Sequence, residues 1–342
     1  MQTDPLSDVL RVLRLSGGMF FRVNLSAPFG ISAMGAETML DTFAPGAAHI
    51  LPFHLVTQGP IWIDVPGNDS VLLEKGDIIV MPHGASHSLC DVSGTEPVPV
   101  ISLKDQVSGF PPTLTSGGDG PESRALCGFF HCNGRLFNPL MESLPEVVVI
   151  RQDPDRTPWL AATMERAFSE TMASRPGGDA LIERLTGLLF LEVVQRYLEQ
   201  NHTSGWLAGL SDPIVSKALG LLHARPERDW TVESLARRVG SSRSVLSERF
   251  SATVGKSPIK YLTAWRMELA AIRLLDTDDA IIDIAEDTGY ESEASFGRAF
   301  KRHSGRPPGT WRKQQKESRP THQGMDVTSF AAVFSGAPAQ GH

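Results

Sequence analysis

Hydrophobic and polar positions change their spacing near residue 150. Before that point, short apolar runs such as Ile61–Val65 and Asp77–Met81 are separated by Gly, Pro and Asn, which is typical of β-strands joined by turns. One short amphipathic helix is predicted ahead of them, near Leu6–Leu15. The Pro- and Gly-rich stretch Val107–Glu122 predicts an exposed loop. The first 150 residues are therefore expected to be mainly β.

From Trp159 onward, apolar residues recur at helical spacing. The runs Leu160–Phe168 and Leu181–Val193 predict two helices, and the break Arg175–Asp179 between them predicts an antiparallel hairpin. The apolar stripe of this hairpin either covers the β-rich part or pairs with the same surface of a second chain, since symmetric dimers are the commonest oligomers. Both alternatives stay open at this stage.

The pattern divides the chain into four parts. Residues 1–150 form a β-rich domain and residues 151–211 a helical hairpin with its linker. Residues 212–316 form an all-helical domain. The tail 317–342 is rich in Gly, Ala and Pro and is expected to be disordered.

The all-helical part contains an internal repeat, which is informative about architecture. Leu235-Ala236 is followed by Gly240, Leu246 and Phe250, and Ile284-Ala285 is followed by Gly289, Phe296 and Phe300. In both copies the alanine and the glycine are four residues apart.

This spacing is typical of a helix-turn-helix. The alanine lets two helices approach at a wide angle, and the glycine permits the positive φ of the turn between them. Ser242 and Ser292 are placed as N-caps of the two second helices. Between the copies, Ser257-Pro258 predicts the start of a long helix over Ile259–Leu275. Such a helix would hold the two units about one turn of DNA apart.

The residues of this region resemble the DNA-binding domain of the AraC/XylS family of bacterial regulators. The first unit, the run Asp283–Ser292, the run Phe296–Arg302 and the closing Pro307–Arg312 carry the resemblance. Tyr290, where Phe is commoner, and Ser304, where an aromatic often lies, depart from the family pattern. The resemblance implies a sequence-specific transcription regulator. The alternative, a helical bundle whose Ala and Gly serve packing only, does not explain two copies at a fixed separation.

The predicted DNA-contacting residues lie on the exposed face of each second helix, where base edges are read. Arg298 is the best candidate for a bidentate contact with guanine. Lys301, Arg302 and Arg249 are expected to neutralise phosphates or to remain solvated. The full predicted set, apart from Arg249, is Arg243, Ser244, Ser247, Glu248, Glu293, Ala294, Gly297, Arg298, Lys301 and Arg302.

Charge changes this picture only modestly. The whole chain has a net charge of −7, which argues against nucleic acid as a partner. Residues 212–319, however, contain 19 Lys and Arg against 15 Asp and Glu, and so carry a net charge of +4. DNA phosphates respond to the local field, so this segment matters more than the whole chain. No apolar run is long enough for a membrane helix, the N-terminus has no signal-peptide pattern, and three cysteines indicate a reducing compartment. The expected location is the cytoplasm.

The β-rich part carries a second resemblance. Gly76–His87 resembles the second motif of cupin barrels, and Gly46–Gln58 lies where the first motif is expected. In that register His54 and His87 keep two of the four usual metal ligands, while Pro52 and Gln58 replace the other two. Together with Leu126–Phe130 and Leu144-Pro145, these motifs resemble the cupin sensor domain that precedes many AraC-type readers.

Two imidazoles could bind zinc or iron if a further ligand joined them. Cys127 is the preferred third ligand, and the other candidates are His49, Cys90, His131 and Cys132. Two other readings stay open: His54 and His87 as buried, hydrogen-bonded residues, which is the more ordinary case, and a pocket for a small ligand.

The expected fold class is two-domain α+β: a cupin-like β-barrel with a helical hairpin, then two helix-turn-helix units joined by a long helix. The expected function is a one-component regulator that senses a small-molecule effector, binds double-stranded promoter DNA as a homodimer and alters recruitment of RNA polymerase. The rivals are a metal-dependent cupin enzyme with an appended DNA-binding domain, which the incomplete ligand set disfavours, and an architectural DNA-binding protein that senses nothing.

Overall fold

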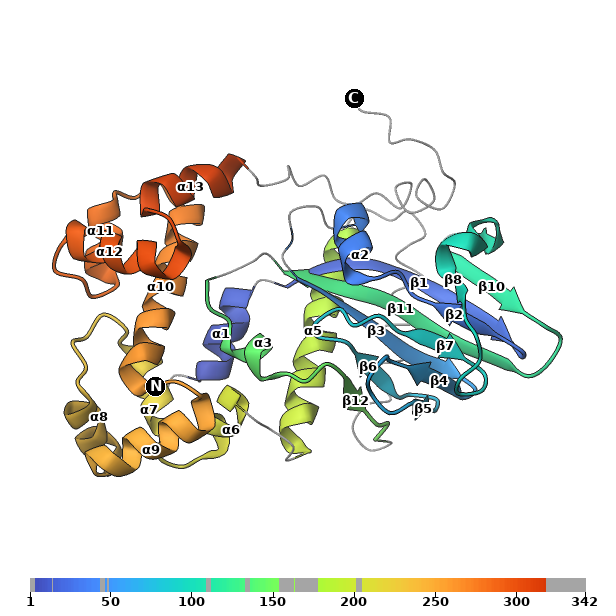
Figure 1. The fold of residues 1–342 in the computed structure, drawn as a ribbon, viewed down its shortest axis with the longest axis horizontal. Coiled ribbons are helices and arrows are strands. Elements are labelled where there is room, and N and C mark those ends of the chain that lie inside the picture. Colours follow the sequence, from blue (N-terminus) through green and yellow to red (C-terminus); the bar gives the residue numbers. More distant parts are fainter. Residues whose placement is uncertain are drawn as a thin grey trace. The chain divides into compact units, whose positions relative to one another are not determined.

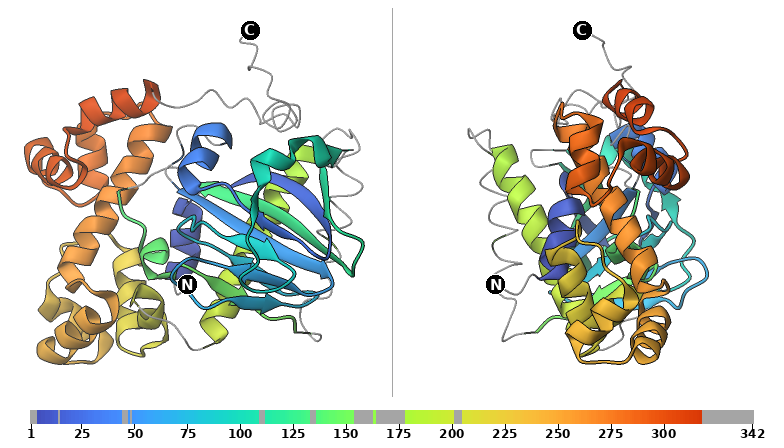
Figure 2. Two further views of the ribbon diagram at one scale, coloured as in Figure 1. Left: turned by 45° about the vertical axis from the view of Figure 1, so that its right-hand side comes forward. Right: turned by 90° about the vertical axis from the view of Figure 1, so that its left-hand side faces the viewer.

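The computed structural model describes residues 4–13, 15–43, 47, 49–108, 112–132, 136–153, 163, 178–200 and 205–317. They form two compact units (Figures 1 and 2). The sheet unit contains the described residues between 15 and 132 and between 145 and 200, and the helical unit contains residues 4–13, 136–144 and 205–317. This division differs from the expected boundary at residue 150, because two segments of the N-terminal part fold with the helical unit.

The strands of the sheet unit form two sheets. Their bounds are β1 (Ser16–Ser26), β2 (Gly30–Ser32), β3 (His49–Gln58), β4 (Ile61–Asp64), β5 (Val71–Leu73), β6 (Ile78–Val80), β7 (Ser88–Cys90), β8 (Val98–Pro99), β9 (Val107–Ser108), β10 (Thr113–Gly117), β11 (Glu122–Cys132) and β12 (Val148–Ile150). The seven-stranded sheet has the order β12-β6-β3-β11-β1-β10-β9, and the five-stranded sheet the order β5-β4-β7-β2-β8. Among the described residues, the two sheets do not join into the single closed barrel that the cupin motifs predict.

One hydrophobic core is shared by both sheets. It includes Val23 and Phe129 from the seven-stranded sheet and Ile63 and Leu89 from the five-stranded sheet. Side chains alternate along a strand, so neighbours on β11 face opposite sides. Cys127 and Phe129 belong to the shared core, whereas the Phe130 ring lies edge-on to Phe190 of α5 (Gly178–Glu199), with centroids 5.5 Å apart.

Two sequence predictions for this unit need comment. The stretch expected to be an exposed loop, Val107–Glu122, instead contributes β9 and β10, because Leu114 is buried and β10 pairs in parallel with β1. The second helix of the expected hairpin is α5, while the first, beginning near Trp159, lies outside the described residues apart from residue 163. The remaining helices of the unit are α2 (Ala36–Phe43) and η1 (Val100–Gln106).

The helical unit contains the predicted repeat. Its helices are α1 (Pro5–Leu13), α3 (Pro139–Ser143), α6 (Gly205–Ser211), α7 (Val215–Ala224), α8 (Val232–Val239), α9 (Arg243–Val254), α10 (Pro258–Asp276), α11 (Ile281–Asp287), α12 (Glu293–Ser304) and α13 (Pro308–Glu317). The two helix-turn-helix units are α8–α9 and α11–α12, joined by the long helix α10. The tail that was expected to be disordered lies outside the described residues from 318 onward.

Local chemistry explains where the helices of the repeat begin and end. The hydroxyls of Ser242 and Ser292 accept hydrogen bonds from the backbone of Val245 and Ser295, which confirms both predicted N-caps. Gly240 and Gly289 adopt φ values of 73° and 79°, which confirms the need for glycine in both turns. Ser257 occupies the N-cap position of α10 without a side-chain capping bond, and Pro258 begins the helix.

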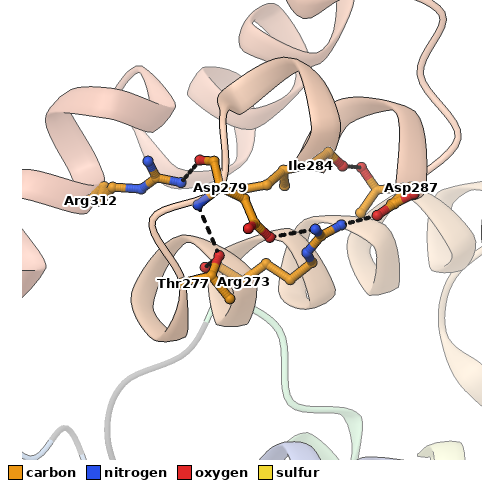
Figure 3. A network of polar contacts seen from close by, with 7 residues as sticks. Arg273, Thr277, Asp279, Ile284, Asp287 and Arg312 are labelled. Carbon is orange, nitrogen blue, oxygen red and sulfur yellow. Dashed lines mark hydrogen bonds and ion pairs between the residues drawn. The ribbon is translucent and has the colours of Figure 1, made fainter.

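A polar network holds α11 and α13 against the end of α10 (Figure 3). The Arg273 guanidinium, on the last turns of α10, pairs with the carboxylates of Asp279 and Asp287. Arg312 on α13 donates a 2.7 Å hydrogen bond to the Asp279 carbonyl. Lys316 pairs with Asp278 at 2.6 Å. These contacts fix the loop that leads from the long helix into the second helix-turn-helix unit.

Candidate DNA-binding face and N-terminal cavity

The second helix of each helix-turn-helix unit packs with one stripe and leaves the opposite face open. Leu246 and Phe250 of α9 are fully buried, as are Phe296 and Phe300 of α12. Every predicted base-reading residue lies on the remaining surface. Arg243, Ser244, Glu248, Glu293, Ala294 and Arg298 are exposed, as are Lys301 and Arg302, while Ser247 and Gly297 are partly exposed.

Gly297 is a sensitive probe of that open face. A Cβ atom added there would meet no other atom within 4 Å. The centre of the second recognition face is therefore not covered by the described protein. The face is therefore free to lie in a groove of DNA.

The charged residues of the two faces differ in their partners. Arg243, at the start of α9, forms a 2.7 Å ion pair with Glu233 of α8, and both side chains are at least half exposed. Exposed ion pairs of this kind contribute little stability, so a phosphate or base can replace Glu233 at small cost. Arg249 lies 3.5 Å from Asp212. Arg298 lies in the middle of α12 and is exposed.

The two recognition helices are held at a fixed separation. Helix α10 has 19 residues and is therefore about 28 Å long at 1.5 Å per residue. Arg266, near its middle, donates hydrogen bonds to the carbonyls of Pro226 and Arg228, which precede the first unit, at 2.6 and 2.8 Å. The same guanidinium lies 5.7 Å from the ring centre of Tyr290 in the turn of the second unit. One residue of the connecting helix thus contacts both the loop that leads into the first unit and the turn of the second unit.

The sheet unit encloses a cavity of about 60 Å³. Its wall is almost entirely apolar and includes Val23, Ile31, Met34, Leu89, Leu114 and Phe129. The polar side chains that reach it are His54, His87 and Cys127. A second depression of about 250 Å³ shares Ala33, Met34 and Val100 with the cavity, so these three residues separate the two spaces.

His54, His87 and Cys127 form one buried hydrogen-bonded chain. His54 and Cys127 are cross-strand partners on β3 and β11, and the His54 Nδ1 lies 2.8 Å from the Cys127 Sγ. The His54 Nε2 lies 2.7 Å from the His87 Nε2, and the His87 Nδ1 lies 2.9 Å from the Ala85 carbonyl oxygen. The structure therefore brings together all three residues that the sequence predicts for this site.

The carbonyl of Ala85 sets the direction of every bond in this chain. A carbonyl only accepts, so the His87 Nδ1–H must donate to it, which leaves the His87 Nε2 as an acceptor in the neutral ring. The His54 Nε2–H then donates to His87, and the His54 Nδ1 accepts from the Cys127 thiol. Each polar hydrogen has one partner, so the chain is satisfied with all three groups neutral.

Burial favours the same neutral forms. It holds the pKa of His54 well below its usual value, with the neighbouring His87 acting in the same direction. It lowers the pKa of His87 to about 4, although the bond to Ala85 opposes that shift. Burial also raises the pKa of the Cys127 thiol far above its usual value. At neutral pH the polar lining of the cavity therefore carries no charge.

The cupin resemblance implies a metal ion, and the donor set does not fit one as it stands. The two nitrogens of His54 point in different directions, one toward Cys127 and the other toward His87. One ion cannot take all three as ligands. Within the described residues, no group of three or more His, Cys, Asp or Glu side chains is placed to hold a metal. The remaining candidate Cys90 instead contacts the Ser88 hydroxyl and the Thr95 carbonyl.

Three functional residues were missed by the sequence reasoning. Glu268 of α10 is fully buried, and its carboxylate accepts a 3.0 Å hydrogen bond from the backbone N–H of Phe137. Leu136 packs against the core of the second helix-turn-helix unit. A carboxylate among the apolar positions of α10 was the available signal for Glu268, because a buried acid requires partners. Nothing in the local pattern indicated Leu136 or Phe137.

Comparisons with known proteins agree with both parts of the structure. The family model described as Cupin matches residues 4–199, and the model described as Helix-turn-helix domain matches residues 235–314. An AraC-like transcription regulator of Streptomyces lividans is 34% identical over 316 residues, which cover 91% of this chain and 98% of that protein.

Two further relatives are named transcription regulators. The HTH-type transcriptional regulator AlkR of Acinetobacter baylyi is 29% identical over 267 residues, covering 76% of this chain and 87% of that protein. The RCS-specific HTH-type transcriptional activator RclR of Escherichia coli is 26% identical over 305 residues, which cover 86% of this chain and 97% of that protein. These relatives are regulators, which favours a DNA-binding regulator over a cupin enzyme. No helix among the described residues is long and apolar enough to cross a membrane.

Proposed function

This chain belongs to the AraC-like transcription regulators, with an N-terminal cupin domain and a C-terminal helix-turn-helix DNA-binding domain. We propose that the exposed faces of α9 and α12 read promoter DNA in two successive stretches of the major groove. The cavity of the cupin domain holds a small effector that changes this binding.

The observation that carries the first part is the open surface of both recognition helices around Ser247 and Gly297. Each helix buries only its phenylalanine stripe and presents small or polar residues on the other side. Arg298 would read guanine, Glu248 and Ser244 would read or exclude other bases, and Lys301 and Arg302 would neutralise phosphates.

The test is selection of DNA by the full-length protein. Random genomic fragments are incubated with it, bound fragments are sequenced, and the affinity of the best fragment is compared with that of a shuffled version. A shared sequence bound at least a hundredfold more tightly than its shuffled version supports the proposal. Equal binding of both would contradict it and would favour the architectural alternative.

The lining of the cavity indicates the chemical class of the effector. Its wall is apolar, and its polar groups are neutral and already hydrogen-bonded to one another. A charged ligand would lose its hydration there without gaining a partner, which is costly. The effector is therefore an uncharged, mainly apolar small molecule. The cavity volume of about 60 Å³ is well below the roughly 150 Å³ of a cavity that holds benzene. An effector of the size of benzene or larger therefore requires Met34 or Val100 to move.

Matched probes test this class. Benzyl alcohol, benzoate and benzylammonium each have one aromatic ring and differ in charge. Hexanol, hexanoate and hexylammonium each have a six-carbon chain and differ in charge in the same way. The neutral member of each series should raise the midpoint of thermal unfolding most, and Leu114→Phe, which fills the cavity, should abolish that rise. A charged member that binds more tightly than its neutral counterpart would contradict the proposed class.

A homodimer is supported by the outer surface of α5. Leu181 and Leu188 are 42% and 46% exposed and seven residues apart, and the partly exposed Leu191 and Leu198 are also seven residues apart. Two series of apolar residues, each with a seven-residue repeat, form the seam of paired helices. A second copy of this chain, which presents the same leucines, is the proposed partner of this stripe.

The remaining parts of the proposal follow from the activity of a regulator. The protein acts in the cytoplasm, where promoter DNA is accessible, and alters recruitment of RNA polymerase once bound. Cys90, Cys127 and Cys132 are buried and are not joined in disulfides, which is compatible with a reducing compartment. Zinc or iron is not assigned to the cavity, because His54 directs its two nitrogens to different partners.

A further inference from the structure

The segment Leu136–Ser143, hereafter the crossing segment, comes from the N-terminal half of the sequence and folds within the helical unit. It contains Leu136, Phe137, Asn138 and the short helix α3. Asn138 caps α3 by accepting a 3.1 Å hydrogen bond from the Met141 N–H. The segment is therefore an ordered part of the DNA-binding unit.

One end of the crossing segment contacts the second helix-turn-helix unit. The Leu136 side chain packs against the core that contains Phe296 and Phe300 of α12. His303, in the last turn of the same helix, hydrogen-bonds to the Leu136 backbone. The C-terminal end of the second recognition helix is thus attached to Leu136.

The other end contacts the first unit. The Glu142 carboxylate lies 2.6 Å from the Nζ of Lys256, which directly follows the Gly255 cap of α9. The Phe137 ring lies edge-on to Tyr261 with centroids 5.4 Å apart, and Tyr261 in turn contacts Phe250 of α9 at 5.7 Å. Glu142 thus reaches the C-terminal end of the first recognition helix through Lys256, and Phe137 reaches it through Tyr261 of α10.

The backbone of Phe137 is also fixed to the connecting helix α10. The buried Glu268 carboxylate on α10 accepts the Phe137 N–H at 3.0 Å. Loss of a hydrogen-bond partner inside the protein costs free energy. The eight-residue segment thus contacts α10 directly, the C-terminal end of α12 through Leu136, and the C-terminal end of α9 through Lys256 and Tyr261.

We propose that the crossing segment is a positioning element that sets the relative orientation of the two recognition helices. A shift of either end would tilt α9 against α12 and would change how well both fit one duplex, while leaving each helix-turn-helix unit intact. The segment follows β11 in the chain, and β11 carries Cys127 and Phe129 of the cavity wall. It is therefore also the route by which effector binding changes DNA binding; this second statement rests on the proposed effector site.

The first test compares a full DNA site with a half-site. The DNA is the selected fragment, either with both groove segments intact or with one of them scrambled. Glu142→Gln removes the ion pair with Lys256, and Leu136→Ala removes the packing against α12. Glu146→Gln is the matched control, because it changes an exposed carboxylate that accepts a hydrogen bond from Asn68 in the sheet unit.

The combined variant Glu142→Gln, Leu136→Ala should bind the full site at least tenfold more weakly and the half-site within twofold of the unchanged protein. The control should match the unchanged protein on both DNAs. An equal loss of affinity for both DNAs would mean that the segment acts only in folding. An unchanged affinity for both would mean that the segment has no role in DNA binding. Both outcomes overturn the proposal. Far-UV circular dichroism of each variant verifies that it is folded.

The second test inserts Gly-Gly-Ser after Cys132 to relax the covalent connection. The affinity of the unchanged protein for the full site should shift with the tightest-binding neutral probe, and the affinity of the insertion variant should not. An insertion variant that responds like the unchanged protein would overturn the proposed route. If the unchanged protein itself does not respond to any probe, the effector site fails, whereas the full-site and half-site comparison still decides the positioning role.

Discussion

The Nε2 atoms of His54 and His87 lie 2.7 Å apart, and both side chains are at most 5% exposed. A single hydrogen occupies the space between them, and the carbonyl of Ala85 determines which ring supplies it. A second proton would place two N–H groups face to face in a site without a counter-charge. The cupin domain is thus folded around a neutral pair.

The first prediction concerns stability against pH. Both histidines have a pKa in the folded protein below the unfolded value of 6.5, and that of His87 is about 4. The unfolded chain therefore binds more protons below pH 6.5. The contribution of the two neutral rings to the free energy of unfolding is expected to be at its full value above pH 6.5. It should fall as the pH falls toward 4, by up to about 1.4 kcal/mol per pH unit for each ring.

Urea unfolding between pH 4.5 and 7.5 measures this slope. The double variant His54→Gln, His87→Gln should make the slope shallower in that range, and His83→Gln, which changes an exposed histidine, should change it less. A slope that is the same in all three proteins would show that this pair does not set the acid sensitivity.

The second prediction concerns base recognition by Arg298. Replacement by Ala should weaken binding by about 1–3 kcal/mol at one base pair and relax specificity there, because the guanidinium fork is lost. Lys301→Ala should weaken binding to all sequences by a similar factor and reduce the dependence on salt. Competition binding with a library of single-base variants distinguishes the two. A uniform loss in Arg298→Ala would make Arg298 a phosphate contact instead.

The third prediction compares two glycines with similar φ. A Cβ at Gly240 would meet nothing within 4 Å, whereas a Cβ at Gly289 would lie 2.3 Å from the Glu227 carbonyl oxygen. Gly240→Ala should cost about 1–2 kcal/mol for the left-handed conformation alone. Gly289→Ala should cost at least twice as much, because the turn must also move away from Glu227. Thermal unfolding of the two variants should therefore give clearly different midpoints, and equal midpoints would contradict the close contact.

The fourth prediction tests the outer surface of α5. Leu188→Asp should convert the proposed dimer to a monomer in sedimentation velocity, since it places a charge among the exposed leucines of α5. Val92→Asp is the control, because Val92 is 61% exposed in the same unit and lies outside α5. A dimer that survives Leu188→Asp would assign the contact to another surface.

Much of the helical unit could be predicted from the sequence, because the residues that specify its helices and turns act locally. The alanine, glycine and serine of each helix-turn-helix act within a few residues, and the predicted caps and turns were confirmed at Ser242, Ser292, Gly240 and Gly289. The long helix was also predicted to within one residue at either end.

The features that were missed depend on distant contacts. The crossing segment meets the helical unit through Phe137 and Glu268, which are 131 residues apart. Thr113–Gly117 reads as a loop from its composition but forms β10, because parallel pairing with β1 supplies its hydrogen bonds. The direction in which each His54 nitrogen points decides whether a metal fits, and no spacing in the sequence encodes it.

The central claim is that two recognition helices, fixed by α10, enter one duplex together. Hydroxyl-radical footprinting of the full-length protein on its selected DNA tests it most directly. For each protein copy bound, the claim predicts two protected stretches about one helical turn apart, and an insertion of five base pairs between them should lower affinity at least tenfold. A single protected stretch, or an affinity unchanged by the insertion, would contradict it.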